Sequence, residues 1–164
     1  MKNNLLFLLP VLILISLFAC RSNPQLREEV YMLLPNAPEV HYKQNDLRKL
    51  DWLAGSWTGK DAGRNFRILF QFHDDQTVEV FNFDEMKGST MSLLSWHDGR
   101  FYFGSNRQWV ISWIGEKDVR LDPAVYGVEP MTFTRLNDRQ WHWIRHTVDG
   151  DEATLLERSE PMQP

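Results

Sequence analysis

Large aromatic side chains, and arginines on the same strand faces, are the groups with which this sequence could bind a ligand. Within each segment they recur at every second residue, which places them on one face of a β-strand. Aromatic walls with a few polar groups are typical of small-molecule pockets, although the same side chains also fill cores. The candidate ligand-binding residues are Trp109, Trp113, Arg135, Trp141, Trp143 and Arg145.

The two arginines in this set need partners, because a guanidinium on an apolar strand face is costly to bury unpaired. Two interpretations follow for Arg135 and Arg145. Each could form an ion pair with a carboxylate such as Glu79 or Glu157, or each could meet a carboxylate carried by a ligand.

His142 and His146 are the candidate cofactor ligands, since both lie on one face of a late strand. Four residues of strand separate them by about 13 Å, so they cannot bind one metal ion together. Either one could serve as a single axial ligand to haem iron. The alternative is that both are ordinary surface histidines, and we expect neither a metal site nor an obligatory cofactor.

The sequence gives little support for an enzyme. It lacks the Gly-x-Ser-x-Gly, His-Glu-x-x-His and phosphate-loop patterns that carry common chemistries. Its formal net charge is −4, and no basic stripe is present, so nucleic acid is not an expected partner. The sequence does not indicate an oligomeric state.

The N-terminus has the pattern of a secretion signal. Lys2 precedes an apolar run from Leu5 to Phe18 that is interrupted only by one proline and one serine. As a helix this run would span roughly 21 Å, which is too short for a hydrocarbon core of about 30 Å. We therefore expect residues 1–19 to be a signal peptide that is removed.

Cys20 is the only cysteine of the chain and follows this run directly. The segment Leu17-Phe18-Ala19-Cys20 resembles the lipobox of bacterial lipoproteins, although Phe18 departs from it. The resemblance implies that Cys20 is lipidated and that the protein is anchored in the cell envelope, facing the periplasm or the exterior. An ordinary secretory signal that happens to contain a cysteine is the alternative.

Three parts follow from composition: the signal peptide at 1–19, a lipidated N-terminus and tether at 20–44, and one domain at 45–160. Prolines at 24, 35 and 38 break any long element in the tether. Leucines at helical spacing predict a short helix that Asn45 or Asp46 caps and that ends at Leu53.

From Gly55 onward the hydrophobic period changes to two, and turn residues recur every eight to twelve positions. Asp98-Gly99 and Asp149-Gly150 are strong hairpin signals. This pattern predicts an all-β domain of about ten antiparallel strands in an up-and-down barrel, with a β-sandwich as the alternative. The expected strands are Gly55–Lys60, Asn65–Phe72, Thr77–Phe83, Thr90–His97, Arg100–Gly104, Gln108–Ile114, Asp118–Leu121, Met131–Arg135, Gln140–Thr147 and Glu152–Arg158.

The helix followed by Gly55-Ser56-Trp57 and Gly59 resembles the entrance to calycin barrels, the superfamily of lipocalins, fatty-acid-binding proteins and nitrobindins. It is most similar to calycin-like domains of bacterial lipoproteins of unknown function. The resemblance implies that Trp57 closes one end of the barrel and that Arg158, on the last strand, lies across its ring.

Three functions remain open after this resemblance. The barrel could bind a small apolar or amphipathic molecule, as its relatives do. It could hold haem through His142 or His146, as nitrobindins do with a histidine. It could instead be an accessory protein with a filled interior, which contacts another envelope protein through a sheet face or a loop such as Asp122–Pro130.

Overall fold

The computed structural model describes residues 40–73, 77–84 and 86–159 of the chain. The predicted signal peptide, Cys20 and the tether up to residue 39 lie outside the described residues. Within the described residues, no helix has the length and the apolar character that crossing a bilayer requires.

One short helix precedes the strands in the part of the chain that the structure describes. It is a 3₁₀ helix, η2, from Gln44 to Leu53, and its three leucines at positions 47, 50 and 53 are buried. The predicted cap is wrong, because Asn45 and Asp46 both lie inside the helix and Lys43 occupies the N-cap position. The Asp46 carboxylate accepts a hydrogen bond of 2.8 Å from the Lys43 backbone N–H.

Ten strands follow, close to the predicted positions and separated by short turns. They are β1 (Gly55–Asp61), β2 (Arg64–Phe72), β3 (Val78–Asp84), β4 (Gly88–His97), β5 (Arg100–Phe103), β6 (Trp109–Ile114), β7 (Asp118–Pro123), β8 (Met131–Asn137), β9 (Gln140–Thr147) and β10 (Gly150–Arg158). The β4–β5 turn has Asp98 and Gly99 at φ of 48° and 80°, as an Asp-Gly hairpin turn requires.

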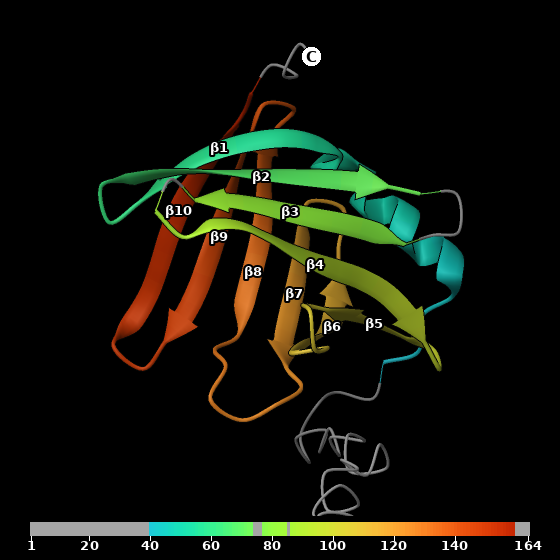
Figure 1. Ribbon diagram of the computed structural model, residues 1–164. Coiled ribbons are helices and arrows are strands. Elements are labelled where there is room, and N and C mark those ends of the chain that lie inside the picture. The colour runs from blue at the N-terminus through green and yellow to red at the C-terminus, as the bar shows by residue number, and fades with distance from the viewer. Residues whose placement is uncertain (1–39, 74–76, 85, 160–164) are drawn as a thin grey trace, which may run out of the picture. The chain divides into compact units, whose positions relative to one another are not determined.

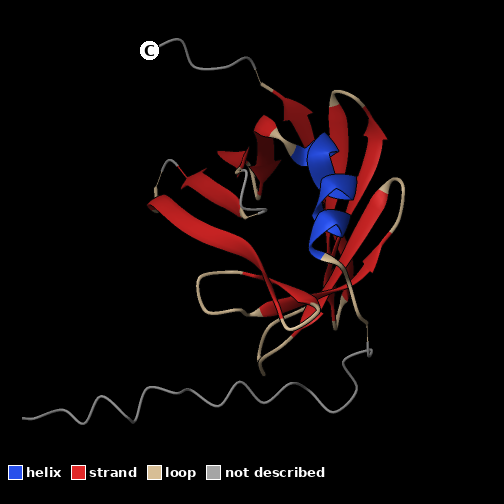
Figure 2. Ribbon diagram, turned by 90° about the vertical axis from the view of Figure 1, so that its right-hand side faces the viewer, coloured by secondary structure: helices blue, strands red, loops and turns tan. Residues whose placement is uncertain are grey.

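The strands form one closed antiparallel barrel in sequence order, so the sandwich alternative is wrong. β1 completes the ring by pairing with β10, with Trp57 opposite Arg158 and Gly59 opposite Leu156. Strands β1 to β4 run across the strands of the opposite wall (Figure 1), and η2 lies across one end of the barrel (Figure 2).

The barrel interior is filled at the η2 end by aromatic rings. Trp141 is fully buried and meets Trp52 and Trp57 edge-on, with ring centroids 6.2 and 6.1 Å away. Gly59 makes room for Phe66, because a Cβ at position 59 would stand 2.8 Å from the Phe66 ring. The absence of a side chain there allows the aromatic cluster to form.

One predicted strand face is wrong. Ile111 pairs with Leu121, but Trp113 pairs with Arg120, because a β-bulge between Ile111 and Trp113 shifts the register. The extra residue turns Trp113 to the outer face, where its side chain is 57% exposed. Trp109 and Trp113 therefore do not share a face.

Candidate ligand-binding site

The η2 end of the barrel is closed around Trp57. The Arg158 guanidinium lies over the indole, with its Cζ atom 4.3 Å from the ring centroid, so the contact implied by the resemblance is present. Arg158 also donates hydrogen bonds of 3.1 Å to the carbonyls of Asp138 and Ala54. The indole N–H of Trp57 donates to the Leu53 carbonyl at 2.7 Å.

Gly55 is required at this closed end for two reasons. Its φ of 106° is a conformation that side chains rarely adopt, and a Cβ there would stand 3.0 Å from an Arg158 nitrogen. The closed end thus contains all four predicted signature residues, whose contacts bring η2, β1, β2 and β10 close together: Gly55, Trp57, Gly59 and Arg158.

Farther from Trp57, the barrel contains an inner chamber of about 180 Å³. Its wall is mostly apolar and aromatic, with a few hydroxyl and amide groups on one side. The lining residues are Ile68, Phe70, Val80, Asn82, Thr90, Ser92, Phe103, Gln108, Trp109, Met131, Phe133 and Trp143.

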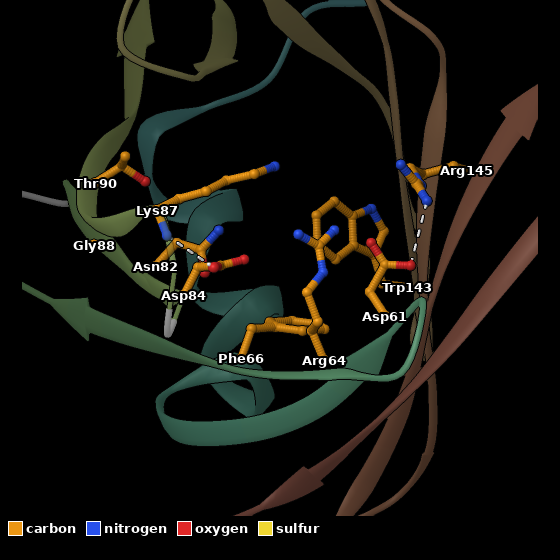
Figure 3. Close-up of a pocket in the computed structure, with 10 residues that line it drawn as sticks. All are labelled: Asp61, Arg64, Phe66, Asn82, Asp84, Lys87, Gly88, Thr90, Trp143 and Arg145. Carbon is orange, nitrogen blue, oxygen red and sulfur yellow. Dashed lines mark hydrogen bonds and ion pairs between the residues drawn. The ribbon is translucent and has the colours of Figure 1, made fainter.

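A second hollow of about 210 Å³, which we call the mouth pocket, adjoins this chamber. Figure 3 shows its charged side chains, which come from β1 to β3, from the β3–β4 turn and from β9: Asp61, Arg64, Asp84, Lys87 and Arg145. Its lining residues are Asp61, Arg64, Phe66, Asn82, Asp84, Lys87, Gly88, Thr90, Trp143 and Arg145.

Asn82, Thr90 and Trp143 line both hollows and so mark the boundary between them. The Asn82 side-chain oxygen and the Trp143 indole nitrogen are both buried without a hydrogen-bond partner. Buried polar groups are nearly always paired, so an unpaired acceptor and an unpaired donor at one level of a cavity call for a partner in that cavity.

The charges of the mouth pocket are unequally compensated. Arg145 forms ion pairs with Glu152 at 2.7 Å and with Asp61 at 3.6 Å. Backbone N–H groups of Met86 and Lys87 donate to the Asp84 carboxylate and lower its pKa, helped by the nearby charges of Arg64 and Lys87.

The structure brings three of the six predicted ligand-binding residues to these hollows, namely Trp109, Trp143 and Arg145. Trp141 belongs to the buried cluster at the closed end, and Trp113 is outside. Arg135 lines neither hollow and pairs with Asp138 in the β8–β9 turn.

Ion pairing of the two arginines is therefore correct in kind, but the expected partners are wrong. Glu79 pairs instead with His73 at 3.1 Å. Glu157 accepts a hydrogen bond of 2.8 Å from Gln140. Glu79 and Glu157 alternate with the inward residues Val80 and Leu156, so both carboxylates point to the outer face of the barrel.

The histidines do not fit a haem inside the barrel. Trp141 and Trp143 point inward from β9, so the alternating residues His142 and His146 point outward. Both ring nitrogens of His146 are within 2.8 Å of a partner, Thr132 on one side and Asp151 on the other. The described residues also contain no cluster of His, Cys, Asp or Glu that could hold a metal ion.

Sequence reasoning missed Arg64, Asn82, Asp84 and Lys87. Parity could have found the first three, because Arg64 is two residues before the inward Phe66, and Asn82 and Asp84 continue the face of the inward Val80. Lys87 lies in the turn between β3 and β4, where alternation gives no direction for a side chain.

No model of a known protein family matches the chain, and none of the curated proteins is similar to it in sequence. Among solved structures, it is similar to a protein of unknown function from the DUF3598 family of Nostoc punctiforme. The identity is 12% and the TM-score 0.46, over 77% of this chain and 52% of the other, so the chain spans about half the length of that protein.

A redesigned β-barrel is also similar, with 17% identity and a TM-score of 0.38, over 69% of this chain and 96% of that one. Similarity at this level says nothing about function.

Proposed function

We propose that this barrel binds one small amphipathic molecule in the inner chamber and the mouth pocket. The apolar part of the ligand occupies the inner chamber, against Phe70, Trp109 and Phe133. Its polar part lies at the level of Asn82 and Trp143 and extends toward the mouth.

The observation that carries this proposal is the pair of unpaired polar atoms on Asn82 and Trp143. A buried donor or acceptor without a partner costs about 1–3 kcal/mol. A purely apolar ligand would leave that cost in place, whereas a hydroxyl or amide group at this level can donate to the Asn82 oxygen and accept from the Trp143 N–H, and so would remove it. Each hollow greatly exceeds the roughly 30 Å³ that one water occupies, so there is room for an organic molecule.

Two other functions receive less support. A haem protein of nitrobindin type would need an inward histidine, and both candidates on β9 point outward. An accessory protein with a filled interior would not need two adjoining hollows, although it would account for a barrel that binds no small molecule.

Binding of 1-octanol to the purified full chain, measured by isothermal titration calorimetry, tests the proposal. Ser92 lines the inner chamber, and in the variant Ser92→Phe the ring would occupy the space that the octanol chain needs. Overpacking costs about 1–3 kcal/mol, so the variant should weaken octanol binding at least about tenfold. The matched control is Ser89→Phe, on the exposed face of the same strand, and it should bind as the wild type does.

Thermal unfolding of both variants separates a blocked chamber from a damaged fold. Native mass spectrometry of the protein as purified adds a second readout, since a bound mass of lipid size supports carriage. The proposal would be contradicted if octanol did not bind, or if Ser92→Phe left its binding unchanged. Either result would favour the accessory protein.

We also propose that the barrel works while tethered to a membrane of the bacterial cell envelope. The support is the apolar run Leu5–Phe18 followed directly by Cys20, which lies outside the described residues. The acidic net charge agrees with a domain that stands off an anionic surface rather than lying on it.

A further inference from the structure

We propose that the outer face of the barrel, on strands β7 to β10, carries a site that hydrolyses small carboxylic esters. Its nucleophile is Thr132, its general base is His146, and Asp151 positions the base. None of these three residues lines the inner chamber or the mouth pocket, so the site is separate from the proposed ligand-binding site.

Strand alternation places these side chains on one outer surface. Met131 and Phe133 are buried and point inward, so Thr132 between them points outward. His146 also points outward, and the register pairs it with Asp151 on β10. Because β8, β9 and β10 are consecutive neighbours in the ring (Figure 1), the three side chains form a row across the sheet.

The distances in this row are those of an activated nucleophile. Nδ1 of His146 is 2.8 Å from a carboxylate oxygen of Asp151, and Nε2 is 2.8 Å from the Thr132 hydroxyl. An ionised carboxylate can only accept, so Nδ1 carries a proton. In the neutral imidazole Nε2 then has a lone pair, to which the Thr132 hydroxyl donates. A base that is bonded to a hydroxyl and oriented by a third group makes that hydroxyl reactive.

Arg120 supplies a positive charge beside the nucleophile. It is the register partner of Thr132 on β7, and it shares the outer face because Val119 and Leu121 on either side of it are buried. Its Nε donates to Asp122 at 3.0 Å, which leaves the terminal amino groups of the guanidinium for another acceptor. Directly opposite residues have Cβ atoms about 5 Å apart, within the reach of an arginine. This charge would stabilise the oxyanion that forms when an ester is attacked.

The reaction has two stages. Thr132 Oγ1 attacks the carbonyl carbon of the ester and its proton passes to Nε2 of His146, which gives a tetrahedral intermediate with its negative oxygen beside Arg120. The bond to the alcohol oxygen then breaks, and the alcohol leaves with the proton from Nε2, so that the acyl group remains on Oγ1. Water attacks this acyl group and gives a proton to Nε2, which returns it to Oγ1 as the carboxylic acid is released.

Hydrolysis of p-nitrophenyl acetate by the purified full chain tests the site. Thr132→Val keeps the shape of the side chain without its hydroxyl, and His146→Gln removes the base. Each should lower kcat/KM about a hundredfold, which is the lower end of what a general base contributes. The lower end applies because the Asp151 side chain is 65% exposed, so that water screens its charge.

The same two strands offer matched controls. Thr134→Val and His142→Gln change the same residue types on the same outer face, but the register partners of His142 are Thr134 and Leu155 and include no carboxylate. Both controls should keep the wild-type rate, which separates the site from reaction of the ester with any exposed imidazole. Thermal unfolding of all four variants by circular dichroism shows whether the fold is intact.

Two further variants test the supporting groups. Arg120→Gln should lower kcat at least about tenfold, because the oxyanion loses its positive partner. Asp151→Asn should also lower kcat at least about tenfold, because the imidazolium that forms on His146 loses a charged partner. It should leave KM unchanged, since Asp151 does not touch the ester.

A fluorophosphonate identifies the nucleophile, since Thr132 Oγ1 would bond to phosphorus and displace fluoride while His146 takes the hydroxyl proton. Peptide mass spectrometry should find the phosphonyl group on Thr132 of the wild type and not in His146→Gln. The site is overturned if the full chain hydrolyses the ester no faster than buffer does, or if the controls lose as much activity as Thr132→Val and His146→Gln. A phosphonyl group found only on other residues overturns it as well.

Discussion

Arg158 joins parts of the chain that are far apart in sequence. Its guanidinium covers Trp57 on β1 and donates to the carbonyl of Ala54, which follows η2, and to that of Asp138 in the β8–β9 turn. Among the described side chains, Arg158 is the charged donor to the carbonyls of both Ala54 and Asp138. The closed end of the barrel therefore depends on one residue near the end of the last strand.

Replacement of this arginine should be costly. Arg158→Met keeps an unbranched apolar stem but loses the charged hydrogen bonds and the cation–π contact, so the free energy of unfolding should fall by about 1–3 kcal/mol. Urea denaturation monitored by circular dichroism measures this change. Arg139→Met, an exposed arginine in the neighbouring turn, is the control and should cost less than about 0.5 kcal/mol.

At the residue scale, sequence alone reached only part of the site. Trp143 and Arg145 could be placed because β9 alternates without interruption. Trp113 could not, since one inserted residue in β6 reverses every later side chain and leaves no mark in the pattern. Arg64 is a solvent-exposed residue beside a turn, and nothing in its sequence context shows that it borders a pocket.

At the scale of elements, most of the fold could be predicted. About ten strands were expected and the described part of the chain forms ten, because period-two alternation and Asp-Gly turns mark sequential hairpins clearly. The closing pair could not be derived from local patterns: β1 and β10 are almost a hundred residues apart, and only the resemblance linked Trp57 to Arg158. The buried leucines of η2 recur at every third residue, which is the period of a 3₁₀ helix, but the sequence prediction named only a short helix and not its type.

The strands are not equally well attached, and the seam between β5 and β6 is the shortest. β5 has four residues and shares two register pairs with β6, Tyr102 with Val110 and Phe103 with Trp109. β1 and β2 share seven register pairs. Fewer ladder bonds mean a smaller free energy of local opening at this seam.

Hydrogen–deuterium exchange should therefore begin at this seam. Peptides that cover Arg100–Phe103 and Trp109–Ile114 should exchange faster than those that cover Arg64–Phe72, as mass spectrometry of the native protein can measure. Addition of 1-octanol should slow the exchange of the peptide that contains Trp109, which lines the inner chamber. Uniform protection around the ring would contradict this ranking of the seams.

At the scale of the whole molecule, the two ends of the barrel differ in kind. One end is filled by aromatic rings under η2, and the other has charged side chains around a hollow. Composition alone could not show this division, because the seven tryptophans and the scattered charges of the sequence give no sign of which end each will reach.

The proposed tether gives a prediction for the intact protein. Cys20→Ser, produced in a bacterial host, should move the protein from the membrane fraction to the soluble fraction, because acyl chains contribute about 0.8 kcal/mol per buried CH₂. Intact mass spectrometry should show acyl chains on the wild type and none on the variant. A wild-type protein that is already soluble, with a free thiol at Cys20, would point to an ordinary secretory signal.

Trp57 and Arg158 close the η2 end of the barrel, so the interior can be reached only from the opposite end. A ligand bound as proposed would enter with its apolar chain first and leave through the same opening with its polar group first. A protein that receives the ligand would then meet the polar group before the apolar chain. Recognition of the polar group, rather than apolar contact, would govern the transfer.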